Sequence, residues 1–229
     1  MKKVNSVQLD GLVESCRIVG ELSGRTVAKL SVVTLHPNGS AGVASVPLSS
    51  QYDKFHHLVR VCASGETAKA LALLEKELRT ERAAGEVDLM SLHPCSVSGV
   101  LRFGPDGDAL VDVLDGGFSL TDRVKTRDNN LVRITGNVLS VSFTDESARL
   151  QVGTDEGPVS VFFLKSLNRS GWDAVSAGKL SKGDMLTLSG PLVVSEYTDG
   201  KKDIRTCMLT PHAIHKHKLE RKRSSGQSF

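Results

Sequence analysis

Apolar and polar residues alternate in short runs along the whole chain. The clearest run covers residues 130–138, Asn-Leu-Val-Arg-Ile-Thr-Gly-Asn-Val, with a glycine at Gly136. Alternation with a period of two is typical of a strand with one buried face, and an internal glycine is typical of a strand that bends at a barrel corner. We therefore predict that this stretch is the first strand of a small β-barrel.

Further runs of strand length follow this one. They cover residues 147–154, 159–164, 182–192 and 203–209, and a polar segment at 165–182 has room for one short helix. Turn residues at 197–200 form the tip of a hairpin that joins the last two runs. Three strands, a helical connection and a terminal hairpin are the element order of a five-stranded OB barrel.

The first half of the chain repeats the second. Residues 5–13 have the same frame of Asn, Val, apolar residue, Gly and Val as residues 130–138, at an offset of 125 positions. The match continues with 27–34 against 148–154 and with 96–101 against 187–192. A repeat of this length predicts two equivalent units. The predicted fold class is all-β with one or two helices, built as two tandem five-stranded OB-fold barrels that do not form one continuous sheet.

The first repeat contains an insertion. Between matching glycines it spans 88 residues, against 54 in the second repeat. The extra residues include 66–82, where Leu71, Leu74 and Leu78 fall on one face and four acids balance four bases. This pattern predicts an amphipathic helix. We expect the helix to cover one end of the barrel, and binding of a partner is the alternative.

These patterns divide the chain into four parts. We predict an N-terminal OB barrel at 1–122 with the inserted helix, a linker at 123–129, a C-terminal OB barrel at 130–214 and a disordered basic tail at 215–229. The alternating apolar positions are the predicted cores of the two barrels, namely Val7, Leu9, Leu30, Val32 and Val97, and Val132, Ile134, Leu150, Val152, Leu186 and Leu188.

Three motifs of the second half resemble the bacterial single-stranded DNA-binding protein (SSB) family. They are Asn-x-Val-x-Ile-x-Gly-x-Val at 130–138, Lys-Gly-Asp before a strand that ends in Gly-Pro-Leu at 182–192, and Glu-Tyr-Thr-Asp-Gly at 196–200. Their order and approximate spacing are similar to those of the family. The resemblance implies an OB fold that binds single-stranded DNA, and a homodimer, because SSBs commonly act through four OB folds.

The end of the chain departs from that family. Bacterial SSBs typically end in acidic residues and a terminal Pro-Phe that recruits partners, whereas this chain keeps only Phe229 after a basic, polar stretch. The resemblance therefore does not carry over partner recruitment through the tail.

Composition indicates a globular protein with reduced thiols. Apolar residues make up 39% of the 229 residues, and the start Met-Lys-Lys is not followed by an apolar signal-peptide core. A membrane span needs a run of about 18 apolar residues, which is absent. The four cysteines are scattered, without a Cys-x-x-Cys pair, so neither a zinc ribbon nor a disulfide framework is indicated. We expect a cytoplasmic or nucleoid-associated protein of bacterial or phage origin, with a mitochondrial setting as the alternative.

Net charge is concentrated in the tail. Residues 1–125 carry 14 Lys and Arg against 15 Asp and Glu, and residues 126–229 carry 15 against 11. Residues 215–229 alone hold five bases and one acid, so the barrels themselves are close to neutral. A positive binding surface therefore depends on where individual bases are placed.

Aromatic residues are the first candidates for a nucleic-acid site, because bases stack on them in OB folds. Tyr197 is the best candidate, since SSBs commonly carry a stacking aromatic on the last hairpin; an ordinary exposed tyrosine is the alternative. Phe103 occupies a similar region of the first repeat. Phe162 and Phe163 are adjacent, so one faces the core and the other the outside. Trp172 is expected to pack against the barrel end rather than stack on bases.

Basic residues supply the predicted phosphate contacts. The candidates are Arg149, Lys29, Arg102, Lys201, Lys202, Arg205, Arg133 and Lys165. Arg149 and Lys29 are the better supported, because they occupy matching positions of the two repeats. A solvated strand face is the alternative reading of this pair.

Catalytic motifs are missing from the sequence. It contains no P-loop, no Gly-x-Ser-x-Gly elbow and no His-Glu-x-x-His pair, so we predict no enzymatic activity. The histidines at 56–57 and at 212, 215 and 217 have no partner thiols or carboxylates close in sequence. We predict neither a metal site nor a cofactor.

Two functions from different classes fit these observations. The first is a tandem-OB protein that coats single-stranded nucleic acid, DNA rather than RNA, in replication, recombination or repair. The second is an OB-fold interaction or assembly subunit that binds protein in a DNA-maintenance or RNA-processing complex. The sequence alone leaves open whether the first barrel binds nucleic acid or only protein.

Overall fold

The computed structural model describes residues 3–22, 25–35, 56–84, 93–103, 109–122, 130–165, 168–199 and 202–217. The elements of the first half are β1 (Asn5–Leu22), β2 (Arg25–Leu35), β3 (His56–Ser64), α2 (Gly65–Ala84), β4 (His93–Phe103) and β5 (Ala109–Leu120). Those of the second half are β6 (Asn130–Phe143), β7 (Ser147–Thr154), β8 (Gly157–Leu164), α3 (Arg169–Ser176), β9 (Met185–Gly190), β10 (Leu192–Asp199), β11 (Lys202–Leu209) and β12 (Ala213–Lys216). The predicted all-β class is confirmed.

The strands of the first half close on themselves. β1 pairs antiparallel with β2, β2 pairs with β3, and β4 pairs with both β1 and β5. β3 and β5 run parallel and complete the circuit β1-β2-β3-β5-β4. This is the strand order of a closed OB barrel.

The second half closes in the same way, with two of its strands interrupted. β6 pairs with β7 and β9, β7 pairs with β8, and β8 runs parallel to β11. Pro191 separates β9 from β10, and Pro211 separates β11 from β12, because proline has no N–H to donate to the ladder. The amides of Thr210 and His212 still donate across these breaks to carbonyls of the opposite strand, each at 3.0 Å.

The first strands of the two halves pair in the same register with their neighbours. Val7 lies opposite Gly99 in the β1–β4 ladder, and Val132 lies opposite Gly190 in the β6–β9 ladder. Val7 and Val132 are related by the 125-residue offset, and Gly99 and Gly190 are the glycines of the matching runs 96–101 and 187–192. The match predicted between residues 5–13 and 130–138 is therefore present in the strand pairing.

A glycine is required at the same point of both first strands. A Cβ atom on Gly11 would collide with the carbonyl oxygen of Val33, and one on Gly136 with that of Gly153. Each glycine lets its strand approach the backbone of the next strand closely, as a barrel corner needs.

β1 and β6 also pair with each other, through the edges that β2 and β7 leave free. Val7 lies opposite Val132, Asn5 opposite Ile134, and Leu9 opposite Asn130. Because residues 5, 7 and 9 are equivalent to 130, 132 and 134, this antiparallel pairing has local two-fold symmetry. We call it the seam. The described strands thus form one connected sheet, and the prediction that the barrels do not share a sheet was wrong. Unpaired strand edges bind other strands readily, and here the two barrels satisfy each other.

Asn5 and Asn130 begin the two seam strands and make the same bracket. Each side chain accepts a hydrogen bond from one backbone N–H at 2.9 Å and donates to the carbonyl of that same residue at 2.8 Å. The bracketed residues are Leu101 for Asn5 and Leu192 for Asn130, each two residues after the matching glycine. The bracket thus fixes the start of the first strand against the fourth in both halves.

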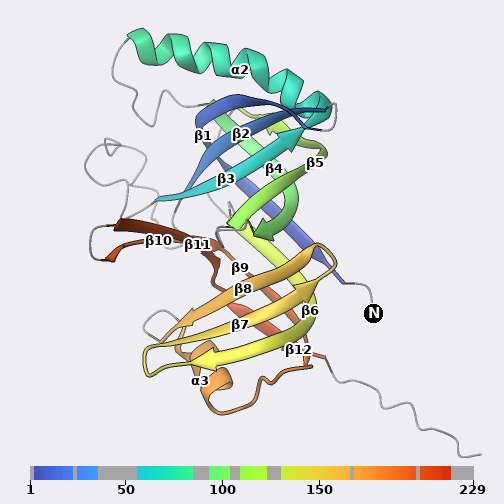
Figure 1. Ribbon diagram of the computed structural model, residues 1–229, viewed down its shortest axis with the longest axis vertical. Coiled ribbons are helices and arrows are strands. Elements are labelled where there is room, and N and C mark those ends of the chain that lie inside the picture. Colours follow the sequence, from blue (N-terminus) through green and yellow to red (C-terminus); the bar gives the residue numbers. More distant parts are fainter. Residues whose placement is uncertain are drawn as a thin grey trace, which may run out of the picture.

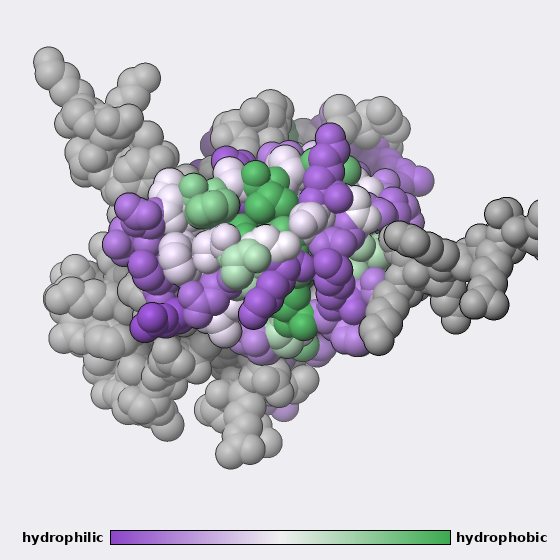
Figure 2. Space-filling model, turned by 90° about the horizontal axis from the view of Figure 1, so that it is seen from below, coloured by the Kyte–Doolittle hydropathy of each residue, from purple (hydrophilic) through white to green (hydrophobic). Residues whose placement is uncertain are grey.

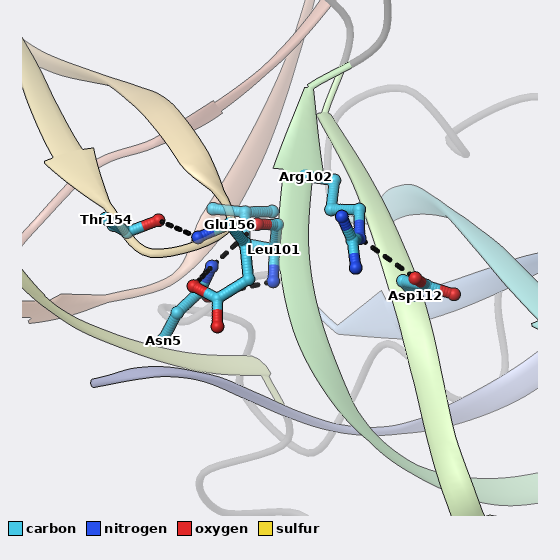
Figure 3. Close-up of polar contacts among 6 residues, drawn as sticks. All are labelled: Asn5, Leu101, Arg102, Asp112, Thr154 and Glu156. Carbon is cyan, nitrogen blue, oxygen red and sulfur yellow. Dashed lines mark hydrogen bonds and ion pairs between the residues drawn. The ribbon is translucent and has the colours of Figure 1, made fainter. Parts of the chain in front are cut away.

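Each of these asparagines also contacts the other half. The Asn5 side chain donates to Glu156, in the β7–β8 turn, at 3.1 Å (Figure 3). The Asn130 side chain donates to the hydroxyl of Thr34, at the end of β2, also at 3.1 Å. The seam is therefore held by side chains as well as by backbone pairing.

The helices cover opposite ends of the molecule, α2 over the first half and α3 over the second (Figure 1). α2 buries Leu71, Leu74 and Leu78 in the core, whereas Leu73 is 71% exposed. The predicted helix at 66–82 and its role as a cover are confirmed. All eleven predicted core residues are buried as well.

The start of the predicted tail belongs to the sheet. His215 and Lys216 lie in β12, opposite Thr187 and Leu186 of β9, and the amide of His217 donates to a β9 carbonyl at 2.9 Å. The prediction that disorder begins at residue 215 was therefore wrong. Residues 218–229, and the predicted linker at 123–129, lie outside the described residues.

Candidate nucleic-acid interface

The outer face of β7 and β8 presents an arginine stacked on an aromatic ring. Arg149 lies opposite Phe162 in the ladder, and its guanidinium carbon lies 5.1 Å from the ring centroid. Arg149 also donates to the hydroxyl of Ser160 at 3.0 Å, so ring and hydroxyl together orient the cation. β7 and β8 are the second and third strands of this half, and oligonucleotides bind the corresponding face of OB folds.

The two adjacent phenylalanines divide as predicted, one inside and one outside. Phe163 is fully buried and lines the core together with Val159 and Val161. Phe162 is half-buried on the opposite face of β8. Its ring is thus available beside Arg149 without being needed to fill the barrel.

A second cation–aromatic pair lies at the barrel end. The Nζ atom of Lys165 is 4.3 Å from the ring centroid of Trp172, and it donates to the carbonyl of Asp145 at 3.0 Å. The Trp172 indole N–H donates to the carbonyl of Thr144 at 3.0 Å, and the ring packs against the core. Trp172 therefore packs against the barrel end, as predicted.

The surface seen from below, at the second-half end of the molecule, is mostly hydrophilic, with a few hydrophobic side chains near its middle (Figure 2). The exposed large hydrophobic residues of the second half include Leu139 and Phe143, 43% and 56% exposed, both in β6. The exposed apolar side chains at this end are therefore few, and polar side chains surround them.

The equivalent face of the first half carries a cation without an aromatic ring. Lys29 takes the place of Arg149, and Cys62 lies opposite it where the second half has Phe162. Arg17 lies opposite Lys29 on its other side. The side chains of Lys29 and Arg17 are both exposed.

Cys62 lies between charges of both signs. Burial raises the pKa of its thiol, the Asp112 carboxylate raises it further, and Lys29 lowers it. The thiol is therefore held in its neutral form. Among the described residues, Cys16 and Cys95 are also free thiols.

Two of the predicted site residues are engaged within the first barrel. Arg102 forms an ion pair with Asp112 at 2.9 Å (Figure 3), which partly neutralises it. Phe103 is half-buried and packs against the core. Neither residue lies on the strands that carry Lys29 and Cys62.

Arg133 is exposed but lies away from Arg149. It occupies the seam part of β6, opposite Ser6 of β1 on one side and Ser189 of β9 on the other. The structure therefore brings Lys29 and Arg149 to equivalent faces and leaves Arg133 on the sheet that joins the two halves.

Tyr197 lies in a strand rather than at the hairpin tip, because it pairs with Ile204 in the β10–β11 ladder. The predicted tip at 197–200 is therefore displaced toward the gap between β10 and β11. This hairpin leaves the second half and contacts β3 of the first (Figure 1). The side chains of Tyr197, Lys202 and Arg205, and the whole of Lys201, lie outside what the structure describes.

The chemistry available at the β7–β8 face is stacking and charge pairing. Across the described ranges, no group of three His, Cys, Asp or Glu side chains is placed to hold a metal ion. Neither of the two described helices is long and apolar enough to cross a membrane.

Part of this surface was not predicted from the sequence. Phe163 has the same parity as the apolar Val159 and Val161, which was the signal that Phe162 faces outward. Arg17 and Arg60 were not among the predicted site residues, although they lie on β1 and β3 and are exposed on the same face as Lys29. The first strand runs past the predicted end at residue 13, so the alternation beyond that point was not used.

Solved structures share this fold over nearly the whole chain. The wild-type single-stranded DNA binding protein from Thermus aquaticus matches with a TM-score of 0.63 at 16% identity, over 99% of this chain and 98% of that chain. A deletion mutant of the same Thermus aquaticus protein matches with a TM-score of 0.59 at 15% identity, over 97% and 98%. No family model and no curated protein matches the sequence. At this identity the likeness shows the fold.

Proposed function

We propose that this chain is a non-enzymatic protein that binds single-stranded DNA and coats it during replication, recombination or repair in a bacterial or phage setting. The observation that carries the proposal is the Arg149–Phe162 stack on the outer face of β7 and β8. A fold shared with single-stranded DNA binding proteins supports it.

Binding at this face needs no covalent chemistry. A base stacks on the exposed aromatic or guanidinium plane, a contact worth about 1–3 kcal/mol per base. Exposed cations on the neighbouring strands neutralise phosphates and release counterions, which makes the affinity fall as salt rises. A duplex offers fewer bases for such stacking, because its bases already stack on one another.

We further propose a homodimer, in which four OB folds act together. The outer face of the seam sheet supports this, because several of its exposed side chains, including Ser6, Gln8 and Ser98, are small or uncharged, and Arg133 opposite Ser6 adds a cation to it. Light scattering at micromolar concentration is expected to give twice the mass of the chain. A monomer at that concentration contradicts this part of the proposal.

A gel-shift series with dT and rU oligonucleotides and a DNA duplex, each at two salt concentrations, tests the function. We expect dT to bind more tightly than rU or the duplex, with affinity that falls as salt rises. If no oligonucleotide binds even at low salt, the protein-interaction subunit becomes the better reading.

The contribution of the tail is tested by a chain that ends at His217, which preserves β12. Residues 218–229 contain four bases and one acid. Their removal is expected to weaken binding and flatten its salt dependence, because cationic contacts are lost, and to keep the preference for single strands. Loss of that preference shows instead that the tail, and not the barrel face, selects single strands.

A further inference from the structure

The strand faces of the two halves can be compared position by position, because they pair in the same register. Their outer positions form matching rows across the first three strands of each half. The rows are Ser15-Ser31-Arg60 and Arg17-Lys29-Cys62 in the first half, and Ser140-Gln151-Ser160 and Ser142-Arg149-Phe162 in the second. Each position therefore has a known counterpart.

The two sets of rows differ in charge and in aromatic content. In these described rows, the first half carries three basic residues, Arg17, Lys29 and Arg60, and no aromatic residue. All three basic residues are exposed. The rows of the second half carry one basic residue, Arg149, and one aromatic residue, Phe162. Serines stand at the counterparts of Arg17 and Arg60, so the difference is confined to a few positions. We call these surfaces the cationic face and the aromatic face.

We propose that the two faces divide one ligand between them: the cationic face of the first half binds phosphates without stacking, and the aromatic face of the second half stacks bases. This inference rests on the single-strand binding proposed above. It gives the first half a role in binding the nucleic acid, because three exposed cations on adjacent strands suit a phosphate backbone.

The two kinds of contact have different physical signatures. A phosphate contact on a single strand changes the slope of log affinity against log salt by about 0.7 and is indifferent to bases. A stacking contact depends on the base and leaves the salt slope unchanged. The cationic face is therefore expected also to bind polyanions that have no nucleobases, and to bind them more strongly than the aromatic face, whose rows hold Arg149 as their one cation.

Exchange of counterpart residues separates the faces. Phe162→Cys gives the second half the residue of the first, and the double variant Arg17→Ser with Arg60→Ser gives the first half the serines of the second. Both changes are on outer surfaces, so the cores stay filled. A matched double variant, Lys76→Ser with Lys182→Ser, removes two exposed bases that lie outside both faces.

The probes are a dT oligonucleotide and an abasic oligomer of the same length, titrated into the full-length chain at several salt concentrations. Phe162→Cys is expected to weaken dT binding by roughly 5- to 150-fold, with abasic binding and the salt slope unchanged. The Arg17/Arg60 double variant is expected to weaken both probes alike and to lower the slope by about 1.4. The Lys76/Lys182 control is expected to keep the slope of the parent.

Several outcomes overturn the division of the ligand. It is wrong if Phe162→Cys weakens both probes equally, or if the Arg17/Arg60 variant changes the slope no more than the control does. Should Phe162→Cys fail to fold, Cys62→Phe still decides, because a ring beside Lys29 is expected to raise affinity for dT and not for the abasic oligomer. A parent chain that binds neither probe contradicts the proposed function itself, which is a distinguishable result.

Discussion

At the seam, a single side chain can form hydrogen bonds with backbone groups that are buried from water. Asn130 is 7% exposed and satisfies both backbone groups of Leu192, so its removal leaves a buried N–H and a buried carbonyl without partners. Each such group costs about 1–3 kcal/mol.

Asn130→Ala is therefore expected to lower the free energy of unfolding by about 2–6 kcal/mol, measured by urea titration. Asn5→Ala is the matched control, because Asn5 makes the same bracket with Leu101 but is only half-buried. Water can replace part of its bonds, so its loss is expected to cost less. Equal effects of the two substitutions contradict this explanation.

The buried thiol of Cys95 makes stability depend on pH in the alkaline range. Burial raises its pKa from 9.0 to about 12, a backbone hydrogen bond at Gly11 lowers it, and Asp10 raises it. The folded protein keeps this proton where the unfolded chain loses it. The resulting stability is fully present below pH 9.0 and is lost as pH rises toward about 12.

Between these pH values the parent is expected to lose about 1.4 kcal/mol per pH unit more than Cys95→Ala. The comparison with Cys95→Ala cancels the titration of lysines and tyrosines, which occurs in both proteins. Parallel stability curves for the two proteins, from urea titrations at each pH, count against a buried neutral thiol.

Tyr197 remains a prediction, since it belongs to a hairpin strand whose side chains the structure does not describe. Tyr197→Ala is expected to weaken dT binding by roughly 5- to 150-fold if its ring stacks on a base. The salt slope is expected to stay constant, because no phosphate contact is lost. A variant that binds as well as the parent in the gel-shift assay removes Tyr197 from the site.

At the scale of elements, α2 is a highly charged helix that is held against the barrel by one row of buried leucines, Leu71, Leu74 and Leu78. Leu74 is 3% exposed and contacts the barrel core, whereas the adjacent Leu73 is 71% exposed. Leu74→Ala is expected to cost about 2–5 kcal/mol, because it opens a cavity in the core. Leu73→Ala is expected to stay within about 0.5 kcal/mol in the same thermal or urea unfolding. A comparable loss from both variants shows that α2 does not seal the barrel.

The alternation in the sequence was enough to predict most strands and the positions that face the core. It worked because residues with a period of two can be buried on only one side of a strand. It missed the ends of long strands, since β1 contains irregular register near Val13 and near Ile18 that shifts the parity of later residues. Arg17 lies between these two points and was overlooked for that reason.

At the scale of the whole molecule, the seam makes the two halves interdependent. Residues 7–9 of β1 use both edges, one for β4 and one for β6, so a separated first half exposes unpaired backbone groups. The pairing was not predictable from the sequence, because alternation determines which side of a strand is buried and not which strand lies along its edge.

We expect the full chain to unfold in one cooperative transition. Scanning calorimetry is expected to give a calorimetric enthalpy equal to the van't Hoff enthalpy, as a two-state transition requires. Two resolved transitions show that each half is stable without the other and that the seam is weak.

The two-fold symmetry of the seam has a consequence for any ligand that has direction. A nucleic-acid strand runs from a 5′ end to a 3′ end, whereas the symmetry operation that exchanges β1 and β6 reverses the direction of each strand. A strand that passes straight across both faces therefore meets the second in the opposite polarity to the first. To present the same polarity to both, the strand must turn back on itself around the molecule.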